Sequence, residues 1–339
     1  MTVRLLPVDE GSQVGAVRRA ASELAVRSGF NEVDAGRVAL VATELATNLL
    51  KHAGKGSVVL YGVREGETDG VEMLALDRGP GMANLPECLR DGFSRTGSAG
   101  TGLGALQRVS SRISIYAPEG LGTSIAVTIW PTGRIPTPPP VTVSGFSIPH
   151  PSEEVCGDAW ATALEGQCVY VIVADGLGHG IQAADASRLA GTVFRQAPKT
   201  SPAELLSRLH LALRPTRGAS VAIAKLDAVA CTVHFAGVGN IAGYIWDPAG
   251  AATSGMKAMV SFPGTLGHEA RTIREFAYPW PGSGTMVMCS DGIGTRLDPG
   301  AYPGLISKAP NIIAGVLFRD YRRERDDATV VVARRSGDL

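Results

Sequence analysis

A proline-rich segment divides this chain of 339 residues and does most to constrain its fold. Residues 131–140 read PTGRIPTPPP and contain five prolines. Because proline fixes φ and has no backbone N–H, this segment cannot run through a helix or a central strand. We expect an extended, semi-rigid linker over residues 131–142, between one domain at residues 1–130 and another at residues 143–339. The chain is long enough for two hydrophobic cores.

Charge and cysteine content narrow the class of protein. Lys plus Arg and Asp plus Glu number 32 each, so the overall charge predicts no binding to nucleic acid or to an anionic membrane. The five cysteines form no CxxC pair, which favours buried free thiols in a reducing cytosol over disulfides or zinc. The N-terminus lacks the apolar core of a signal peptide, and no apolar stretch could span a bilayer. We expect a soluble, cytoplasmic protein, and an oligomer is compatible with these features.

The periodicity of apolar residues predicts an α/β (α+β) protein. In the N-terminal half, helical spacing and strand-like runs predict an α/β two-layer sandwich, a mixed sheet with helices on one face. The helices are expected near residues 14–24, 33–49 and 103–109, and the strands near 57–63, 71–76, 112–116 and 123–130. The C-terminal half is richer in strands and predicts packed sheets flanked by helices. Its strands are expected near 169–174, 220–225, 231–236, 242–246, 272–276, 285–289 and 329–334, and its helices near 180–196, 202–214 and 311–323.

The second expected helix carries a pair of residues suited to phosphoryl transfer. Glu44 and Asn48 are four residues apart, so they share one face of the helix. Asn48 can ligate Mg²⁺, and Glu44 can orient or deprotonate a nucleophile beside a γ-phosphate. Nearby, His52 has two readings, as a phosphate contact or as a histidine interacting with helix C-terminal carbonyls.

Two glycine-rich motifs follow and complete a nucleotide-binding pattern. Asp77 directly follows a strand and can accept a hydrogen bond from the adenine amine, while Gly79 and Gly81 let the backbone approach the base. The second motif opens a helix, where free backbone N–H groups favour phosphate. Its candidate binding residues are Gly100, Gly102, Leu103 and Gly104. Each motif alone is weak, but their order predicts a nucleotide site, and neither a Walker P-loop nor a Rossmann fingerprint fits.

The N-terminal half resembles the GHKL ATPase superfamily, in its serine-kinase and anti-sigma-factor branch. The resemblance covers residues 10–130 and rests on TELATNLLKHAGKG (43–56), DRGPGM (77–82) and TGLGALQRV (101–109). It implies a Bergerat-type ATP-binding fold. The KHAGKG continuation is similar to small stressosome kinases of the RsbT type, which phosphorylate a Ser or Thr on a partner STAS domain. By this resemblance Glu44 is the catalytic base, Asn48 the Mg²⁺ ligand and Asp77 the adenine contact.

Aspartates stand at strand ends throughout the C-terminal half. Asp158 follows a glycine, Asp175 and Asp291 each end an apolar run, and Asp326 and Asp327 precede another. An acidic residue that abuts a buried strand is costly unless something neutralises it, and converging carboxylates suit a hard divalent cation. Two such ions can hold a phosphate and activate a water. A single Asp-Gly after a strand is usually only a turn.

These aspartates lie in motifs that resemble the metal-dependent protein phosphatase (PPM) superfamily, in its compact SpoIIE/RsbX branch. The motifs, in order, are CGDAW (156–160), VADGLGHG (173–180), GVGN (237–240), MCSDGIGT (288–295) and RDDATVVVA (325–333). The resemblance implies an αββα sandwich and two Mn²⁺ or Mg²⁺ ions. It assigns the ligands as Asp158, Asp175, the Gly176 carbonyl, Asp291 and Asp326, with Asp175 and Asp291 as catalytic residues.

Three C-terminal details qualify this resemblance. Many relatives have a further Asp soon after the first Gly-Asp, but here the next acid is Glu165. Asp327 is either a ligand or a residue that shapes the strand start. His179 is either a proton donor to the leaving group or, more simply, a helix-start residue.

The two resemblances imply a bifunctional signalling regulator. We expect an ATP-dependent Ser/Thr kinase and a phosphoserine/phosphothreonine phosphatase, acting on a STAS-domain partner in a stress or sigma-factor pathway. In one alternative the N-terminal domain is an ATP-sensing or anti-sigma binding module without phosphoryl transfer. In another, the phosphatase domain is a metal-free scaffold, against which the retained Asp175, Asp291 and Asp326 argue.

Overall fold

The computed structural model describes residues 3–85, 102–197, 200–248, 255–294 and 296–336. The chain folds into two compact units, Met1–Pro139 and Pro140–Leu339. The division falls inside the proline-rich segment, and the strand β6 begins at Val141, two residues before the expected start of the second domain. No helix of the described residues is long and apolar enough to cross a membrane.

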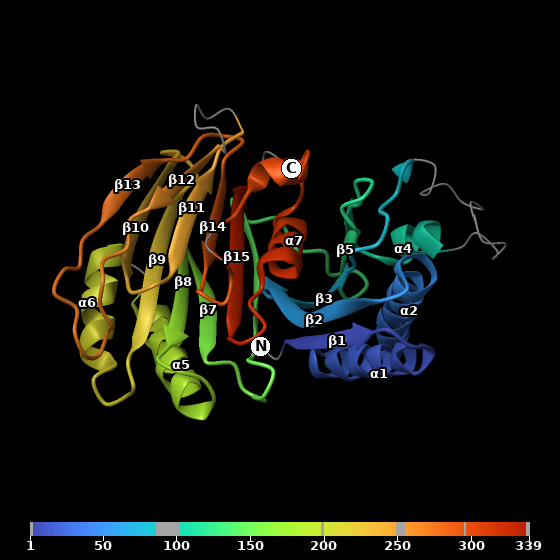
Figure 1. The fold of residues 1–339 in the computed structure, drawn as a ribbon, viewed down its shortest axis with the longest axis horizontal. Coiled ribbons are helices and arrows are strands. Elements are labelled where there is room, and N and C mark those ends of the chain that lie inside the picture. Colours follow the sequence, from blue (N-terminus) through green and yellow to red (C-terminus); the bar gives the residue numbers. More distant parts are fainter. Residues whose placement is uncertain (1–2, 86–101, 198–199, 249–254, 295, 337–339) are drawn as a thin grey trace. The chain divides into compact units, whose positions relative to one another are not determined.

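The N-terminal unit is a two-layer α/β sandwich (Figure 1). Its antiparallel sheet has the order β1-β2-β3-β5-β4, and its helices share a core with one sheet face. The strands are β1 (Arg4–Val8), β2 (Gly56–Glu65), β3 (Thr68–Leu76), β4 (Arg112–Tyr116) and β5 (Ser124–Ile129). The helices are α1 (Gly11–Arg27), α2 (Glu32–Asn48) and α4 (Gly102–Val109). The expected helices are present, whereas the periodicity missed the short strand β1.

Helix α2 has two features that the periodicity did not predict. It continues directly into a π-helical turn, Leu49–Ala53, which ends at Gly54 with φ of 74°. Near its other end, the buried Asp34 accepts hydrogen bonds from the Thr132 backbone N–H (3.0 Å) and hydroxyl (2.6 Å). Burial alone would raise the pKa of Asp34, but these hydrogen bonds and the Arg37 guanidinium lower it overall. The start of the proline-rich segment is therefore fastened to α2.

The C-terminal unit is an αββα sandwich built from two antiparallel sheets of five strands (Figure 1). One sheet has the order β13-β10-β9-β8-β7 and the other β12-β11-β14-β15-β6. The first comprises β7 (Asp158–Glu165), β8 (Cys168–Gly176), β9 (Ala219–Asp227), β10 (Thr232–Val238) and β13 (Phe276–Pro279). The second comprises β6 (Val141–Ile148), β11 (Ala242–Trp246), β12 (Met256–Met259), β14 (Thr285–Cys289) and β15 (Ala328–Arg335).

Alternation along the strands builds the layers of this sandwich. Along β8, Val169, Val171 and Val173 face the other sheet, while Tyr170 and Ile172 face the helices. Helices α5 (Ile181–Gln196) and α6 (Pro202–Ala212) cover the first sheet. On the second sheet α7 (Pro310–Tyr321) packs over β6 and β15. Both predicted folds, the two-layer sandwich and the αββα sandwich, are thus present.

Some C-terminal expectations need correction. The strand expected at residues 272–276 lies later, at Phe276–Pro279, and β6, β7 and β12 were not predicted. The cysteines within the described residues are free, but only Cys289 is buried; Cys156, Cys168 and Cys231 are half-buried. Cys88 lies outside the described residues.

Candidate functional site

The end of α2 carries the first pair of candidate residues. Glu44 and Asn48 are half-buried on neighbouring turns, and Asn48 is the last α-helical residue before the π-helical turn. A π-helical turn widens the backbone spiral and is often found at functional sites. His52 lies in this turn and is exposed, which leaves both of its readings open.

The loop after β3 is held in shape by Asp77. One of its carboxylate oxygens accepts hydrogen bonds from the backbone N–H groups of Gly79 (2.8 Å) and Thr123 (3.0 Å). A Cβ at Gly79 would lie 2.8 Å from that of Ala53, the last residue of the π-helical turn. The loop and the end of the α2 segment are therefore in close contact, and glycine is needed where they meet.

Gly81 turns the same loop back on itself. Its φ is +74°, a conformation that favours glycine, and a Cβ there would clash with the Pro118 carbonyl oxygen. The next residue, Met82, donates its backbone N–H to the Ala117 carbonyl at 2.9 Å. The sequence motif thus forms a compact loop beside the chain that follows β4.

The last glycine-rich motif is described only in part. Gly100 lies outside the described residues, whereas Gly102, Leu103 and Gly104 form the first turn of α4. Leu103 is partly buried against the core that α2 also lines, and α4 packs against α2. The helix that opens the predicted phosphate motif therefore lies beside the helix that carries Glu44 and Asn48.

In the C-terminal unit, strand register brings two predicted ligands together. Asp158 begins β7 and stands directly opposite Asp175 near the end of β8. Gly176 follows, and its backbone N–H donates to the Gly157 carbonyl at 3.2 Å. A Cβ at Gly176 would clash with the backbone of Ala183 on α5, so the close packing there requires glycine. Two like charges opposite each other destabilise a strand pair unless a cation or proton intervenes.

Asp291 and Asp326 reach the same place from the second sheet. Asp291 follows β14, and Asp326 precedes β15, which pairs with β14. Electrostatic repulsion from Asp158, Asp291 and Asp326 acts on Asp175, so all four carboxylates share one neighbourhood. The four aspartates that the sequence proposed as ligands are therefore close enough to interact electrostatically.

The carboxylates make this neighbourhood strongly unfavourable for negative charge. Burial, and then the neighbouring Asp158, Asp291 and Asp326, raise the pKa of Asp175 to about 9. Burial also raises the pKa of Asp158 to about 7, against the opposing hydrogen bonds of Ser290 and Thr329. The pKa of Asp291 is raised as well, by burial and by Asp326. A bound cation would relieve the same repulsion.

The donor set fits a hard divalent cation in its chemistry. One oxygen of Asp158 is buried and accepts no hydrogen bond from the described residues, and the same holds for one oxygen of Asp327. Carboxylate oxygens are the ligands that Mg²⁺ and Mn²⁺ prefer. Within the described ranges, however, no three His, Cys, Asp or Glu side chains converge tightly enough to form a ready-made metal centre. The ligand set consequently stays a proposal.

Two side chains that hold these carboxylates received no role in the sequence analysis. The Ser290 hydroxyl donates to Asp158 at 2.6 Å, and the Asn240 amide donates to Asp291 at 2.8 Å. Asn240 ends the GVGN motif, and the register of β11 with β14 explains its position, since Ala242 opposite Cys289 continues to residue 240 opposite Asp291. The sequence motif therefore pointed to Asn240, but only the pairing of β11 with β14 shows that its partner is Asp291.

Asp327 and two nearby histidines lie next to these carboxylates, because the charge of Asp327 acts on Asp158. Asp327 is buried and accepts the His150 backbone N–H at 2.9 Å. The His150 ring stacks on that of His179, with 5.0 Å between centroids, and His179 contacts Glu153 at 2.7 Å. Both interpretations of Asp327 therefore stay predictions, and His179 has a carboxylate partner compatible with either of its interpretations.

Glu165 does not join the acidic group. It ends β7, the strand that Asp158 begins, and pairs with Cys168. At a rise of about 3.3 Å per residue, the two ends of this strand lie on the order of 23 Å apart.

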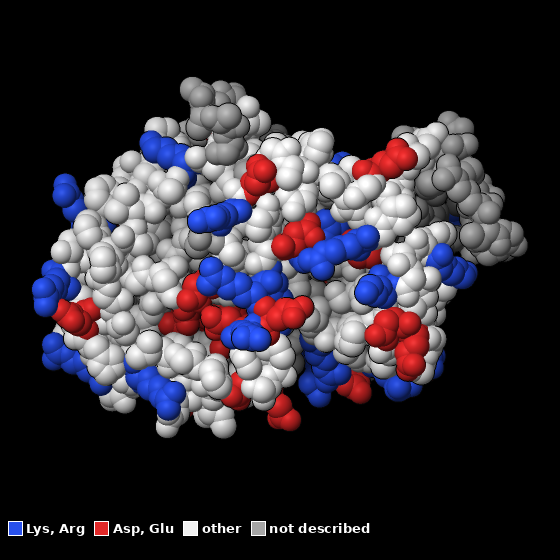
Figure 2. Space-filling model, in the orientation of Figure 1, with Lys and Arg blue, Asp and Glu red and all other residues white. Residues whose placement is uncertain are grey.

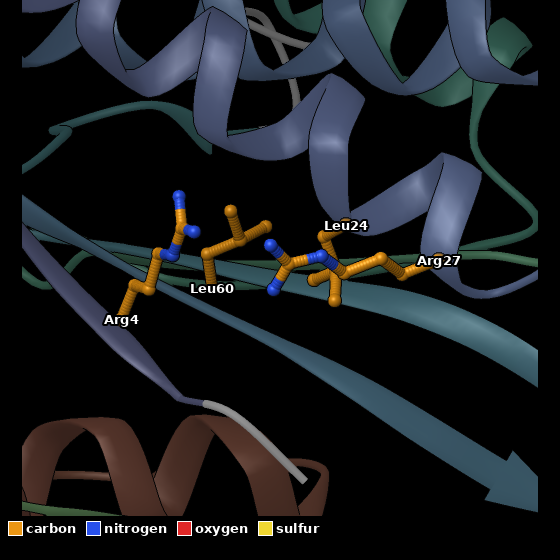
Figure 3. A pocket seen from close by; sticks show the side chains of 4 residues that line it. All are labelled: Arg4, Leu24, Arg27 and Leu60. Carbon is orange, nitrogen blue, oxygen red and sulfur yellow. The ribbon is translucent and has the colours of Figure 1, made fainter. Parts of the chain in front are cut away.

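A small pocket lies elsewhere in the N-terminal unit (Figure 3). It is lined by Arg4, Leu24, Arg27 and Leu60, with the two arginines on either side of Leu60. Arg4 pairs with Glu23 at 3.0 Å. None of the candidate site residues lines this pocket.

Comparisons with known proteins match the two halves of the chain separately. The family model for a histidine kinase-like ATPase domain matches residues 6–129, and the model for stage II sporulation protein E (SpoIIE) matches residues 165–336. The serine/threonine-protein kinase RsbT of Bacillus subtilis (strain 168) is 33% identical over 115 residues, which span 34% of this chain and 86% of that kinase.

Two solved structures share the fold of part of the chain. One is described as "The bacterial stressosome: a modular system that has been adapted to control secondary messenger signaling"; it is 26% identical, with a TM-score of 0.53, and the match covers 57% of this chain and 99% of that one. The other, RsbX in complex with magnesium, is 17% identical, with a TM-score of 0.51 over 60% of this chain and 99% of that one. The chain therefore belongs to the SpoIIE family of PPM phosphatases in its C-terminal half, and joins it to an N-terminal histidine kinase-like ATPase domain of the RsbT type.

Proposed function

We propose that the C-terminal domain is a metal-dependent phosphoserine/phosphothreonine protein phosphatase. Its metal ligands are Asp158, Asp175, the Gly176 carbonyl, Asp291 and Asp326, holding two Mn²⁺ or Mg²⁺ ions. The observation that carries the proposal is the convergence of four carboxylates whose mutual repulsion helps to raise the pKa of Asp175 to about 9. Membership of the SpoIIE family and the likeness to magnesium-bound RsbX support it.

The residues around the carboxylates orient them for this chemistry. When bound, two divalent ions supply charge for the phosphate and acidify a water that can attack phosphorus. Asn240 and Ser290 each occupy one carboxylate oxygen, of Asp291 and Asp158 respectively, so the remaining oxygens have fixed directions. No covalent protein intermediate is required.

The N-terminal domain, in this proposal, binds Mg-ATP and phosphorylates a Ser or Thr of a partner protein. Glu44 acts as the base, Asn48 holds Mg²⁺ and Asp77 binds adenine, with Gly79 and Gly81 close to the base. Support comes from the contact of the Asp77 loop with the end of the α2 segment and from the similarity to the RsbT kinase. The first turn of α4, with the preceding Gly100, would bind the phosphates.

The proposed partner is a STAS-domain regulator in a stress or sigma-factor pathway of the cytoplasm. Its support is the likeness to RsbT and to the solved structure whose description concerns the bacterial stressosome. A kinase and a phosphatase acting together on one site would waste ATP, so we expect one of the two activities to be gated. A second candidate function follows from the half-buried positions of Glu44 and Asn48, which suit binding as well as catalysis: the N-terminal domain binds ATP or an anti-sigma target without transferring phosphate.

One experiment tests both catalytic assignments. The Asp291→Asn variant is mixed with Mg-ATP and a STAS-domain protein encoded nearby, and intact mass reports added phosphate. Wild-type protein with Mn²⁺ is then added, and should remove it. The matched control, Glu44→Gln in the Asp291→Asn background, should bind ATP but add no phosphate.

The outcomes separate the alternatives. Phosphate added and then removed supports both activities. ATP binding without transfer to the partner, in repeated trials with different STAS proteins, favours the binding module. A chemically phosphorylated partner left intact by the wild type would refute the phosphatase.

A further inference from the structure

The chain between α7 and β15 is bound tightly to the turn that carries Asp291. The backbone N–H of Arg323 donates to the Gly292 carbonyl at 2.8 Å, and Gly294 donates to the Tyr321 carbonyl at 2.8 Å. Between them, Ile293 and Arg322 form an isolated antiparallel bridge. The backbone of Arg323 is therefore fixed beside the turn that follows Asp291.

This segment contains three arginines with different surroundings. Arg322 is half-buried, donates to the Pro149 carbonyl at 3.3 Å and lies over the Phe318 ring, so it anchors the segment. Arg323 and Arg325 are both exposed. Of these two, Arg323 is the one whose charge acts on Asp291, where it opposes the rise in pKa caused by burial and Asp326.

The charge of Arg323 is available for a ligand. Among the described residues, no carboxylate forms an ion pair with its guanidinium. Figure 2 shows basic and acidic side chains gathered together where Figure 1 draws the segment between α7 and β15. A phosphate dianion that approaches a site built from carboxylates needs positive charge at its outer oxygens as well as at the metals, and a guanidinium can donate two parallel hydrogen bonds to them.

We propose that Arg323 binds the phosphoryl group of the substrate and so determines its affinity for the C-terminal site. The proposal rests on the proposed phosphatase function. Arg323 holds the outer phosphate oxygens, while the carboxylate side of the site holds the metals. Its backbone anchor at Gly292 keeps the guanidinium within reach without fixing it in an ion pair.

The test compares Arg323→Ala, Arg323→Lys and Arg325→Ala with the wild type, using a phosphoserine peptide as substrate. Inorganic phosphate serves as a competitive inhibitor, and calorimetry measures Mn²⁺ affinity. We expect Arg323→Ala to raise KM and the phosphate inhibition constant by about tenfold to hundredfold, the effect of losing hydrogen bonds to a charged group. Arg323→Lys should recover part of the loss, because it keeps the charge but not the two-pronged geometry.

Arg325→Ala is the matched control from the same exposed segment, and it should leave KM unchanged. Arg217→Ala tests a second basic side chain near the site. The Arg217 guanidinium lies 3.3 Å from where a Cβ on Gly178 would be, and Gly178 is two residues after the proposed ligand Gly176. Mn²⁺ affinity should not fall in any variant, because Arg323→Ala removes a positive charge that acts on Asp291. Weaker phosphate recognition is thereby separated from damage to the metal site.

Specific results would overturn the proposal. An active wild type whose Arg323→Ala variant keeps its KM and phosphate inhibition excludes the role of Arg323. The same holds if only Arg217→Ala weakens phosphate binding, or if Arg323→Ala lowers Mn²⁺ affinity to the same degree as phosphate affinity. A wild type that never hydrolyses the peptide with Mn²⁺ present instead refutes the proposed function itself.

Discussion

The two candidate sites differ in how the protein treats its own polar groups. In the N-terminal domain, the carboxylate of Asp77 accepts two backbone hydrogen bonds, and Glu44 and Asn48 are only half-buried. In the C-terminal domain, Asp158 is 5% exposed, has an oxygen without a donor in the described structure and faces Asp175 across a strand pair. The polar groups of the first site are satisfied without a ligand. In the second site the carboxylates repel one another, and protons or cations relieve this repulsion. In the proposed functions, the first site would bind a nucleotide together with its Mg²⁺, and the second would bind its metal ions before the substrate.

The largest expected difference between the two domains comes from substituting Asp175. Asp175→Asn removes the carboxylate on which the most repulsion converges, and should lower phosphatase turnover by at least about a thousandfold. ATP binding by the N-terminal domain should be unchanged. Hydrolysis of a phosphoserine peptide and binding of a fluorescent ATP analogue measure the two effects. Turnover within tenfold of the wild type would remove Asp175 from the catalytic group.

A second variant tests whether the supporting amide matters. Asn240→Ala deletes the hydrogen bond to Asp291 and should weaken Mn²⁺ binding by about tenfold to hundredfold, because residues that orient ligands typically contribute this much. Calorimetric titration with Mn²⁺ gives the affinity directly. Asn311→Ala is a control, since Asn311 lies on α7, where its side chain bonds only the neighbouring backbone N–H in the described structure. Equal Mn²⁺ affinity in Asn240→Ala and wild type would contradict the expectation.

The candidate site in the N-terminal domain depends on the backbone conformation of the loop after β3. A substitution of its glycine Gly81 tests this most directly. Gly81→Ala should destabilise the ATP domain by about 1–3 kcal/mol and weaken ATP binding, because it adds a clash with Pro118 to an unfavourable backbone conformation. Gly120→Ala is matched in φ, at +77°, but its Cβ would meet no atom within 4 Å. Thermal unfolding of both variants isolates the clash. Equal melting temperatures of Gly81→Ala and Gly120→Ala would mean that the loop shifts and relieves the clash with Pro118.

The smallest expected effect is the pH dependence of metal stabilisation. The folded pKa values of Asp158 and Asp175, about 7 and about 9, lie above the ordinary value of an unfolded Asp. The folded metal-free protein thus binds more protons than the unfolded chain, and it loses stability as pH rises from about 4 to 9. A Mn²⁺ concentration of about 100 times the Kd at pH 8 should raise the melting temperature there by about 5–10 °C. The same concentration should raise it by less at pH 5.5, where protons compete for the carboxylates and the Kd is higher. The control is potassium chloride at matched ionic strength. Equal shifts of the melting temperature at pH 5.5 and pH 8 would contradict competition between protons and Mn²⁺ for these carboxylates.

Much of the fold could be predicted because its strands have clear apolar patterns. The runs at Arg112–Tyr116, Ala242–Trp246 and Thr285–Cys289 were expected with the bounds they have. The strand β7, DAWATALE, was missed because its alanines blur the alternation, although Asp158 at its start was identified. The strand β13 lies later than expected, at Phe276–Pro279, where pairing with β10 decides its position.

In the candidate sites, too, some residue positions follow from sequence order and others depend on strand pairing. The positions of Asp175 near the end of β8 and of Asp77 just after β3 could be predicted from sequence order. Asn240 and Ser290 could not, since their roles depend on which strand lies opposite. The π-helical turn after Asn48 also has no periodic signature over its five residues, Leu49–Ala53.

The fastening of Thr132 to the buried Asp34 limits how far the chain between the two domains can extend. Thr132 is held by α2, and Val141 is already paired with Arg335 in the second domain. Only residues 133–140 join these two anchors, and even fully stretched as a polyproline helix they reach about 25–30 Å. If, as proposed, both domains act on one partner protein, this short linker would keep a partner released by one domain at a high effective concentration near the other.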